Sequence, residues 1–492
     1  MKTSDSLFKK SFRYIFICFL LLLVVYRGVI AFSYTPELVN GESNNIWNAI
    51  NVSNGKPVYT NPEALPLEIY QYTPLSQLPI LCAALVFDSS EMNYVHNITV
   101  TGRLFTLLLN LLTALLLYFA CVQLYLTNRW VVALACLLGL ASLTHLSFAI
   151  RPDAMASFLM MLSFYCFTTF TVSNRTIYLI LCALVLALAF MAKQDAIVII
   201  APLSLVLLLQ GKWKQLGLFD LAFITFLTGM IFIGHWFLGK YFVKSIFIGL
   251  NNPVSYHQFI SVLQRLVELY PVHVIAGNIA IIMGLWKYKS LSKSLPLTLV
   301  TLFFECFAFL TTSKVGSGVS YYTPFILFSS VLILITLYSL WQHKAPSLPL
   351  KYGILLAVLA VSGTFIFRQA YHYTSPFLKY ATSKAEYEHR WTEIEKVCKE
   401  IHLKQQDKIL VLDPLTRIML ATNTIMPNLE YYMVSPFDYS NFIGNEEKGI
   451  DYLIFQSSSA GTMDDCMKFF NINPTTYMLR ETKSEYTILA KR

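Results

Sequence analysis

A long polar stretch near the N-terminus, residues 33–72, reads SYTPELVNGESNNIWNAINVSNGKPVYTNPEALPLEIYQY. It follows an apolar segment at 14–32 and precedes a chain dominated by Leu, Ile, Phe and Val. Glu42 lies within it, ahead of a helix candidate rich in amide and aromatic side chains. The bland interpretation of Glu42 is a solvated loop residue. The alternative, which the rest of the sequence favours, is a catalytic carboxylate in a loop beside a membrane.

The composition of the chain is that of a polytopic membrane protein. Of its 492 residues, 56% are hydrophobic and 13% are charged, whereas soluble domains average about 25% charged residues. The net charge of +9 fits the positive-inside bias of membrane proteins. No basic stripe of the kind that binds nucleic acid is visible. The lipid bilayer is therefore an expected partner, and nucleic acid is not.

Eleven apolar segments are candidates for membrane spans, which need roughly 20 residues to cross about 30 Å of hydrocarbon. They are residues 14–32, 104–126, 130–150, 154–172, 177–191, 196–210, 217–238, 272–286, 295–312, 324–341 and 352–367. The run at 74–88 is short and is interrupted by Pro74 and Pro79. Such a run is typical of an interfacial or re-entrant helix.

The loop charges decide between the two interpretations of 74–88. If this run does not cross, 13 Lys and Arg residues lie in inner loops and 7 in outer loops. If it crosses, the counts become about 11 and 10, so the positive-inside rule favours the first arrangement. That arrangement places four polar clusters on one outer face: the 34–101 loop, Arg151–Asp153, Lys193–Gln194 and Lys314–Tyr322.

The C-terminal part of the chain, residues 369–492, has a different character. Charges are dense, and KILVLD (408–413), YLIFQ (452–456), TTYMLRE (475–481) and EYTILAK (485–491) are strand candidates. Helical patterns occur at 383–401, 415–423 and 463–470. We therefore predict a mainly α protein: a helical transmembrane catalytic domain over 1–368 with a large first outer loop at 34–101, and a small α/β domain over 369–492 on the outer face.

Two short outer turns carry ionisable residues between apolar spans. Arg151-Pro152-Asp153 joins two spans without a spacer, and an Arg and an Asp there can be a snorkelling pair that stabilises the turn. Lys193-Gln194-Asp195 repeats the pattern at the next outer turn. Because ionisable residues embedded in this way are costly, both turns are candidates for a functional site.

A third turn, KVGSGVSYY at 314–322, is rich in small residues. Its backbone N–H groups could approach an anion, with Lys314 as the counter-charge. An ordinary flexible turn is the alternative, and Tyr321 and Tyr322 could be aromatic residues of the membrane interface.

Carboxylates and cations on one face of a helical bundle suit one type of reaction. A hydroxyl acceptor needs a general base, and a departing phosphate needs positive charge where its negative charge develops. A lipid-anchored phosphate donor would explain a site at the membrane surface. The residues are thus compatible with glycosyl transfer from a polyprenyl-phosphate sugar. A transporter or flippase is the alternative, which would instead place ionisable residues deep within broken spans.

Several short motifs occur in an order that resembles a known family. They are Glu42, Gly55-Lys56-Pro57-Val58-Tyr59, Tyr72-Thr73-Pro74-Leu75, Arg103-Leu104, Arg151-Pro152-Asp153 and Lys193-Gln194. Over roughly 14–330 the chain resembles the GT-C superfamily of integral-membrane glycosyltransferases. Within it, the chain is most similar to the bacterial branch related to protein O-mannosyltransferases and lipid A aminoarabinose transferases.

The resemblance implies an inverting transferase. With the loop charges, which place the polar clusters on the outer face, we expect a bacterial inner-membrane protein whose site faces outward. Its donor would be a polyprenyl-phosphate sugar and its acceptor a hydroxyl of a glycan, lipid or protein. Glu42 and Asp153 are the implied catalytic carboxylates. Many relatives carry an Asp-Glu pair where this chain has Gly41-Glu42, so a divalent cation (Mg²⁺, Mn²⁺ or Zn²⁺) held by Glu42 and Asp153 is left open. The residues implied in binding the donor phosphate or other parts of the substrate are Arg103, Arg151, Lys193, Gln194, Lys314, Tyr72, Tyr321 and Tyr322.

Overall fold

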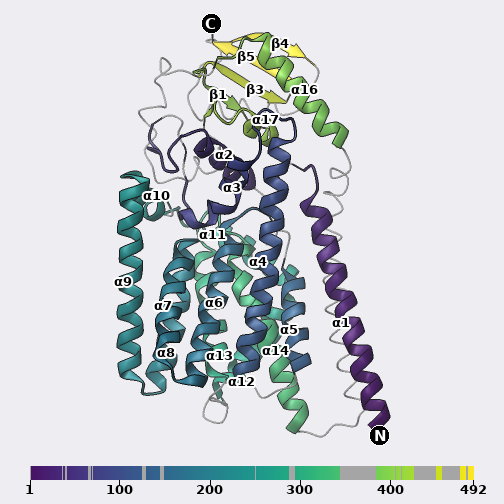
Figure 1. Cartoon of the computed structure of the whole chain (residues 1–492), viewed down its shortest axis with the longest axis vertical. Helices are drawn as coiled ribbons and strands as arrows, with labels where there is room; N and C mark the ends of the chain where they lie inside the picture. Colours follow the sequence, from purple (N-terminus) through teal and green to yellow (C-terminus); the bar gives the residue numbers. More distant parts are fainter. Residues whose placement is uncertain are drawn as a thin grey trace.

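The computed structural model is a helical bundle with a small sheet-containing region at one end (Figure 1). It describes residues 2–491 except 36, 39–40, 65–67, 69, 125–128, 144–148, 250, 287–293, 344–383, 405, 412, 426–449, 457–476 and 484–485. The C-terminus lies in the sheet region, and the N-terminus lies at the opposite end of the bundle.

The long helices coincide with the apolar segments of the sequence. They are α1 (Lys2–Ala31), α4 (Tyr94–Leu124), α5 (Arg129–Ser142), α6 (Pro152–Ser173), α7 (Thr176–Phe190), α8 (Ile200–Leu209), α9 (Trp213–Leu238), α12 (Pro271–Trp286), α13 (Leu295–Thr311) and α14 (Thr323–His343). Leu, Ala and Phe side chains from many of these helices form one large buried core. The candidate span at 352–367 lies outside the described residues.

Membrane crossing is supported for the bundle, but the predicted number of eleven spans is not established. Within the described parts of the chain, four helices are long and apolar enough to cross a bilayer, and a bent pair gives a fifth. That pair joins α11 (Tyr256–Leu269) to α12 with a bend of 91°. Six further apolar helices are only 10–17 residues long. The chain is therefore an integral membrane protein with several apolar helices.

The first loop, predicted at 34–101, contains short elements that lie above the bundle (Figure 1). They are α2 (Glu42–Ser53), the 3-10 turn η1 (Pro74–Gln77) and α3 (Leu78–Val86). With nine residues, α3 is about 14 Å long, which is too short to cross a bilayer. Its Ile80 and Ala83 belong to the same buried cluster as Ile46 and Trp47 of α2. Residues 74–86 thus form a short segment packed on α2, in agreement with the predicted surface segment.

Helix α4 extends beyond the bundle at the end where α2 and α3 lie. Its 31 residues correspond to about 46 Å at 1.5 Å per residue, more than the roughly 30 Å of a hydrocarbon core. The N-terminal turns of α4 therefore rise beside α2 and α3, which brings Arg103 to the first loop (Figure 1).

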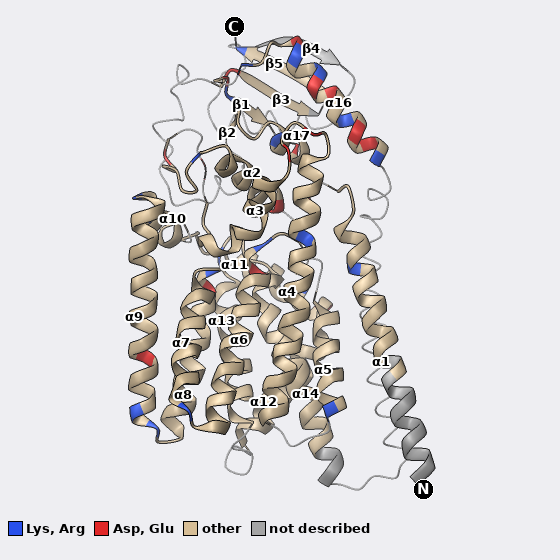
Figure 2. Cartoon of the chain, viewed as in Figure 1, with Lys and Arg blue, Asp and Glu red and all other residues tan. Residues whose placement is uncertain are grey.

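The other short connections form η3 (Gln194–Ile199), α10 (Tyr241–Phe247) and η4 (Val319–Tyr322). Charged residues gather at the two ends of the bundle and in the sheet region, and few lie between them (Figure 2). This distribution matches the low tolerance of a bilayer interior for charge.

The C-terminal region contains a five-stranded sheet of order β2-β1-β3-β5-β4. Its elements are α16 (Lys384–Glu400), β1 (Ile409–Val411), α17 (Pro414–Met419), β2 (Thr424–Ile425), β3 (Tyr452–Gln456), β4 (Tyr477–Lys483) and β5 (Tyr486–Lys491). Strand β1 is parallel to β2 and β3, whereas β5 is antiparallel to β3 and β4. The four predicted strands are all present. The expected helix at 463–470 and the expected domain boundary at 368/369 lie outside the described residues.

Candidate active site

Glu42 is fully buried, and both of its carboxylate oxygens accept hydrogen bonds. Arg103 donates to it from Nε (2.9 Å to Oε1) and from Nη2 (2.8 Å to Oε2). The backbone N–H of Leu38 donates to Oε2 at 2.7 Å, and that of Ile150 donates to Oε1 at 3.0 Å. Both charged side chains are 0% exposed. This ion pair joins the first loop to α4 and to the turn before α6.

The surroundings of Glu42 differ from those expected of a catalytic base. The sequence suggests a catalytic carboxylate in a loop beside the membrane. In the structure, each of its oxygens accepts two hydrogen bonds and neither reaches solvent. An acceptor hydroxyl would have to displace Arg103 or a backbone N–H to reach it. Arg103 is engaged in the same way, since its Nη2 also donates to the carbonyl of Thr35 at 2.8 Å. The geometry favours a positioning role for both residues.

Gly41 stands where the resemblance implies an acidic residue, and its backbone conformation accounts for the glycine. It is the N-cap of α2 and has φ 92° and ψ −6°, a left-handed conformation that favours glycine. Glu37, which the sequence analysis did not single out, accepts from the Gly41 N–H at 2.9 Å and from Ser43 Oγ at 2.8 Å. Burial raises the pKa of Glu37, partly offset by the hydrogen bond from Ser43. Glu37 thus holds the start of α2.

Asp153 lies in the first turn of α6, where an acidic side chain is favoured by the helix dipole. Arg151 is the N-cap of this helix and Pro152 follows it, a position suited to proline because its missing N–H is not needed there. Arg151 Nε lies 3.2 Å from Asp153 Oδ2, and Lys193 Nζ lies 2.9 Å from Asp153 Oδ1. The two turns with ionisable residues, at 151–153 and 193–195, therefore meet.

Lys193 is the centre of this second cluster. Its Nζ contacts Asp153 and lies 2.6 Å from Asp195 Oδ2, and it lies 4.7 Å from the centre of the Tyr321 ring. Burial lowers the pKa of Lys193, but the two carboxylates raise it by more, so the net pKa lies well above its usual value. The ammonium group is therefore charged at neutral pH.

The cluster is less enclosed than the Glu42 pair. The side chains of Arg151, Asp153 and Asp195 are 19%, 10% and 20% exposed. Although Asp153 Oδ2 lies near Arg151, it accepts no hydrogen bond from the described residues. Asp153 Oδ2 is itself buried, so an incoming group would have to displace Arg151 to reach it, whereas parts of Arg151 and Asp195 are exposed. Asp195 is a site residue that the sequence pattern contained but that the list of implied site residues left out.

The structure bears on whether Glu42 and Asp153 could bind a divalent cation, and the two residues differ. Glu42 does not fit a metal ligand, because Arg103 and two N–H groups occupy its oxygens. Asp153 and Asp195 both contact Lys193 Nζ, so the ammonium group occupies the position in which a metal ion would balance their charge. Among the described residues, no group of three or more His, Cys, Asp or Glu side chains is placed to hold a metal ion.

Gln194 and Tyr72 have structural contacts. Gln194 Nε2 donates to the carbonyls of Gln71 (2.6 Å) and Ile246 (3.1 Å), so it ties the first loop to α10. Tyr72 packs in an aromatic cluster that includes Tyr59 and Tyr70. These contacts provide no evidence of a direct role in substrate binding.

The turn at 314–322 contributes one residue to the cluster. Tyr321 reaches Lys193, whereas Tyr322 is 1% exposed and packs in the large core of the bundle. Lys314 forms an isolated antiparallel bridge with Val254. The three residues therefore have separate surroundings, although they are close in sequence.

Comparisons with known proteins agree with this architecture. Residues 92–237 match the family model described as dolichyl-phosphate-mannose-protein mannosyltransferase. No curated protein sequence gives a significant match. A crystal structure of ArnT from Cupriavidus metallidurans, bound to undecaprenyl phosphate, has a TM-score of 0.55 at 13% identity; the match covers 96% of this chain and 97% of that one.

Two structures from Archaeoglobus fulgidus are also similar. The oligosaccharyltransferase AglB, in complex with an inhibitory peptide and a dolichol-phosphate, has a TM-score of 0.56 at 12% identity, over 93% of this chain and 71% of that one. The oligosaccharyltransferase tethered to an acceptor peptide has a TM-score of 0.58 at 13% identity, over 93% and 70%. At these identities the similarity concerns the fold. Together with the family model, it confirms the predicted resemblance to GT-C glycosyltransferases.

Proposed function

We propose that this protein transfers a sugar from a polyprenyl-phosphate donor to a hydroxyl acceptor, with inversion at the anomeric carbon. The observation that carries the proposal is the Arg151–Asp153–Lys193–Asp195 cluster on a GT-C fold. The neighbours ArnT and AglB were solved with undecaprenyl phosphate and a dolichol-phosphate respectively, which supports a donor of this class. The acceptor is a glycan, lipid or protein.

In the proposed reaction, Asp153 is the general base. The acceptor oxygen attacks the anomeric carbon of the donor, its proton passes to Asp153 Oδ2, and the bond from that carbon to the phosphate oxygen breaks. Polyprenyl phosphate leaves with the bonding electrons. Arg151 and Lys193 neutralise the negative charge that develops on it. Glu42 and Arg103 hold the first loop in place and do not touch the reacting atoms.

The donor phosphate also prepares the base. Before the donor binds, Asp153 is stabilised as an anion by Lys193 and Arg151. When the phosphate takes over these cations, Asp153 loses counter-charge and becomes a stronger proton acceptor. Asp195 remains beside Lys193 and keeps the ammonium group in place.

We propose further that the site faces outward from a bacterial inner membrane. The loop charges support this orientation. Cysteines introduced at Lys214 and Lys240, both exposed and at opposite ends of α9, should react with a membrane-impermeant reagent only from the inner and outer side, respectively. Labelling of both from one side would contradict the orientation.

The transfer itself is tested with purified protein and synthetic polyprenyl-phosphate sugars, by release of polyprenyl phosphate and glycosylation of an acceptor. Asp153→Asn should lower kcat by about 10²–10⁴. Asp220→Asn is the matched control, because Asp220 lies on α9 and accepts from Ser204 Oγ (2.7 Å) away from the cluster. Full turnover by Asp153→Asn would overturn the mechanism. A transporter would instead move the lipid without cleaving it.

A further inference from the structure

Helix α2 has two polar faces, and only one of them belongs to the candidate active site. Glu42 points to α4 and to the turn before α6. Asn51 follows nine residues later, and at about 100° per residue this places it on the opposite side of the helix. On that side, Arg417 of α17 donates to Asn44 Oδ1 (3.4 Å), and Lys56 Nζ donates to the carbonyl of Thr422 (2.8 Å).

A cavity of about 470 Å³ lies between this second face and the C-terminal region. Its volume is within the range of small-ligand sites, about 300–1,000 Å³. The first loop contributes Trp47, Asn51, Lys56, Pro57, Thr60 and Glu68, and the C-terminal region contributes residues 406–408 and 422–425.

Three polar atoms of the lining residues lack a hydrogen-bond partner among the described residues. They are Trp47 Nε1, Asn51 Oδ1 and Thr60 Oγ1. Trp47 and Asn51 are only 1% and 2% exposed. Buried polar groups are rarely left unpaired in native proteins. These three lining residues therefore carry an N–H donor, an amide oxygen and a hydroxyl whose hydrogen-bonding capacity is unused within the described structure.

Most of the polar groups around the cavity are neutral. Lys56 and Lys408 are balanced only in part by Asp407, and Lys56 Nζ already donates to the carbonyl of Thr422. Glu68 is buried and accepts a short hydrogen bond from Asn48 Nδ2. Burial raises the pKa of Glu68 to about 8, so its carboxyl group is mostly protonated at neutral pH and can donate a hydrogen bond. The cavity thus offers neutral hydrogen-bond donors and neutral acceptors. The hydroxyl groups of a sugar, which both donate and accept, can pair with such groups.

We propose that this cavity binds a saccharide, through Trp47, Asn51, Thr60 and the C-terminal region. Because it lies across α2 from Asp153, the saccharide is a part of the acceptor other than the hydroxyl that reacts. The assignment to the acceptor rests on the proposed function, but the binding of a saccharide does not.

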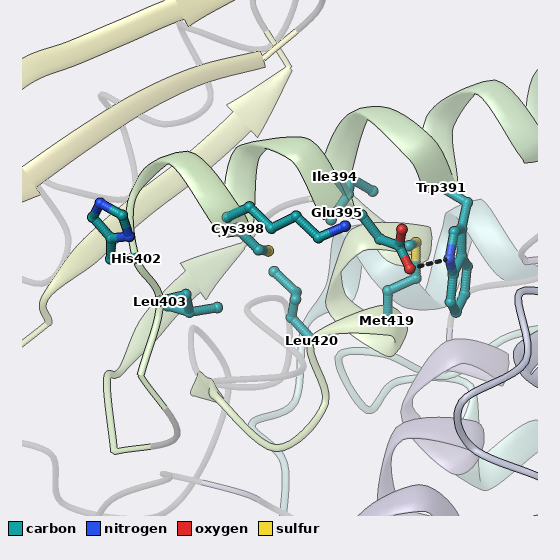
Figure 3. A pocket seen from close by; sticks show the side chains of 9 residues that line it. Trp391, Ile394, Glu395, Cys398, His402, Leu403, Met419 and Leu420 are labelled. Atoms are coloured by element: carbon teal, nitrogen blue, oxygen red, sulfur yellow. Dashed lines mark hydrogen bonds between the residues drawn. The ribbon is translucent and has the colours of Figure 1, made fainter.

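A second hollow in the C-terminal region provides an internal control (Figure 3). It has a volume of about 560 Å³ and lies between α16 and α17. Trp391 Nε1 already donates to Glu395 Oε1 at 3.1 Å. None of the residues lining this hollow has a buried polar atom without a partner in the described structure. It therefore lacks the feature that points to a ligand in the first cavity.

The test is direct binding to the purified full chain without donor lipid, by saturation-transfer NMR and calorimetry. The probes are methyl glycosides of glucose, galactose, mannose and N-acetylglucosamine, with inorganic phosphate as an anionic probe. At least one glycoside should bind, and Asn51→Leu should weaken it about tenfold. Thr60→Val, nearly isosteric and therefore safe for folding, should weaken it about fivefold. Glu395→Gln, in the second hollow, should leave binding unchanged.

Three results would overturn the inference: no glycoside binds, Asn51→Leu and Thr60→Val both bind as tightly as the wild type, or phosphate binds in place of the glycosides. The outcome is independent of catalysis. Glycoside binding that these variants weaken, in a protein that transfers no sugar, would refute the proposed function and leave the saccharide site standing.

Discussion

Glu42 and Asp153 are both ion-paired carboxylates at the same end of the bundle, but their surroundings differ. Glu42 is sealed: four N–H groups bind its two oxygens and no part of it is exposed. Asp153 shares its partner Lys193 with Asp195, and one of its oxygens accepts no hydrogen bond from the described residues. The first arrangement suits a fixed support, and the second suits a group whose partners change during a reaction.

The difference follows from the cost of burying charge. A buried ion pair is stable only when its geometry is good and its remaining hydrogen bonds are satisfied, and the Glu42–Arg103 pair meets both conditions. A cluster that must receive a phosphate cannot be satisfied in advance by its own side chains. Incomplete pairing at Asp153 is thus a better indication of function than the presence of a carboxylate.

The largest expected effect comes from breaking the sealed pair. Arg103→Met leaves the Glu42 carboxylate buried without its counter-charge and should lower the free energy of unfolding by about 3–5 kcal/mol. Thermal unfolding in detergent measures this loss. The double variant Arg103→Met/Glu42→Gln should regain part of the stability, because no unpaired charge remains. A stable Glu42→Gln variant that loses all turnover would instead make Glu42 catalytic.

A smaller effect, on catalysis, is expected at the open cluster. Lys193→Met removes the cation nearest to Asp153 and should lower kcat/KM for the lipid donor about 10²-fold, a loss typical of one group that stabilises developing charge. The measurement is initial rates against donor concentration. Lys240→Met serves as the matched control, since Lys240 is exposed and lies over the Tyr241 ring, 5.0 Å from its centre. Equal losses in both variants would contradict a specific contact between Lys193 and the donor phosphate.

The smallest effect is expected at the aromatic edge of the cluster. Tyr321→Leu removes a cation–π contact of about 0.5–1 kcal/mol, so KM for the donor should rise about two- to fivefold with kcat nearly unchanged. Tyr322→Leu, in contrast, should lower the melting temperature without changing the KM, because Tyr322 packs in the core of the bundle. If Tyr322→Leu raised the KM and Tyr321→Leu only lowered the melting temperature, Tyr322 and not Tyr321 would belong to the site.

Local patterns in the sequence predicted most of the fold. Apolar runs located the long helices, and loop charge indicated that 74–88 is not a span. The sequence also selected Arg151, Asp153 and Lys193, because ionisable residues beside apolar spans are conspicuous. These inferences depend on neighbours along the chain, which a single sequence displays.

Long-range partners were not visible in the sequence. Glu42 was expected to be a catalytic carboxylate, but three of its four hydrogen bonds come from Arg103 and Ile150, which lie 61 and 108 residues away. Glu68 lies in an unremarkable polar stretch, and its burial depends on how the first loop and the C-terminal region meet. Such contacts are properties of the packed chain, so spacing alone could not identify them.

The sealed ion pair also has a consequence for substrate length. Glu42 anchors α2 through two hydrogen bonds from Arg103 of α4 and one from the N–H of Ile150 in the turn before α6, so a shift of the helix would disturb a buried ion pair. The helix therefore acts as a spacer between the ion pair at Glu42 and the proposed saccharide cavity at Asn51, which lies nine residues, or about 14 Å, further along the helix axis. An acceptor shorter than this distance can occupy one site at a time, so the protein would measure the length of the molecule that it modifies.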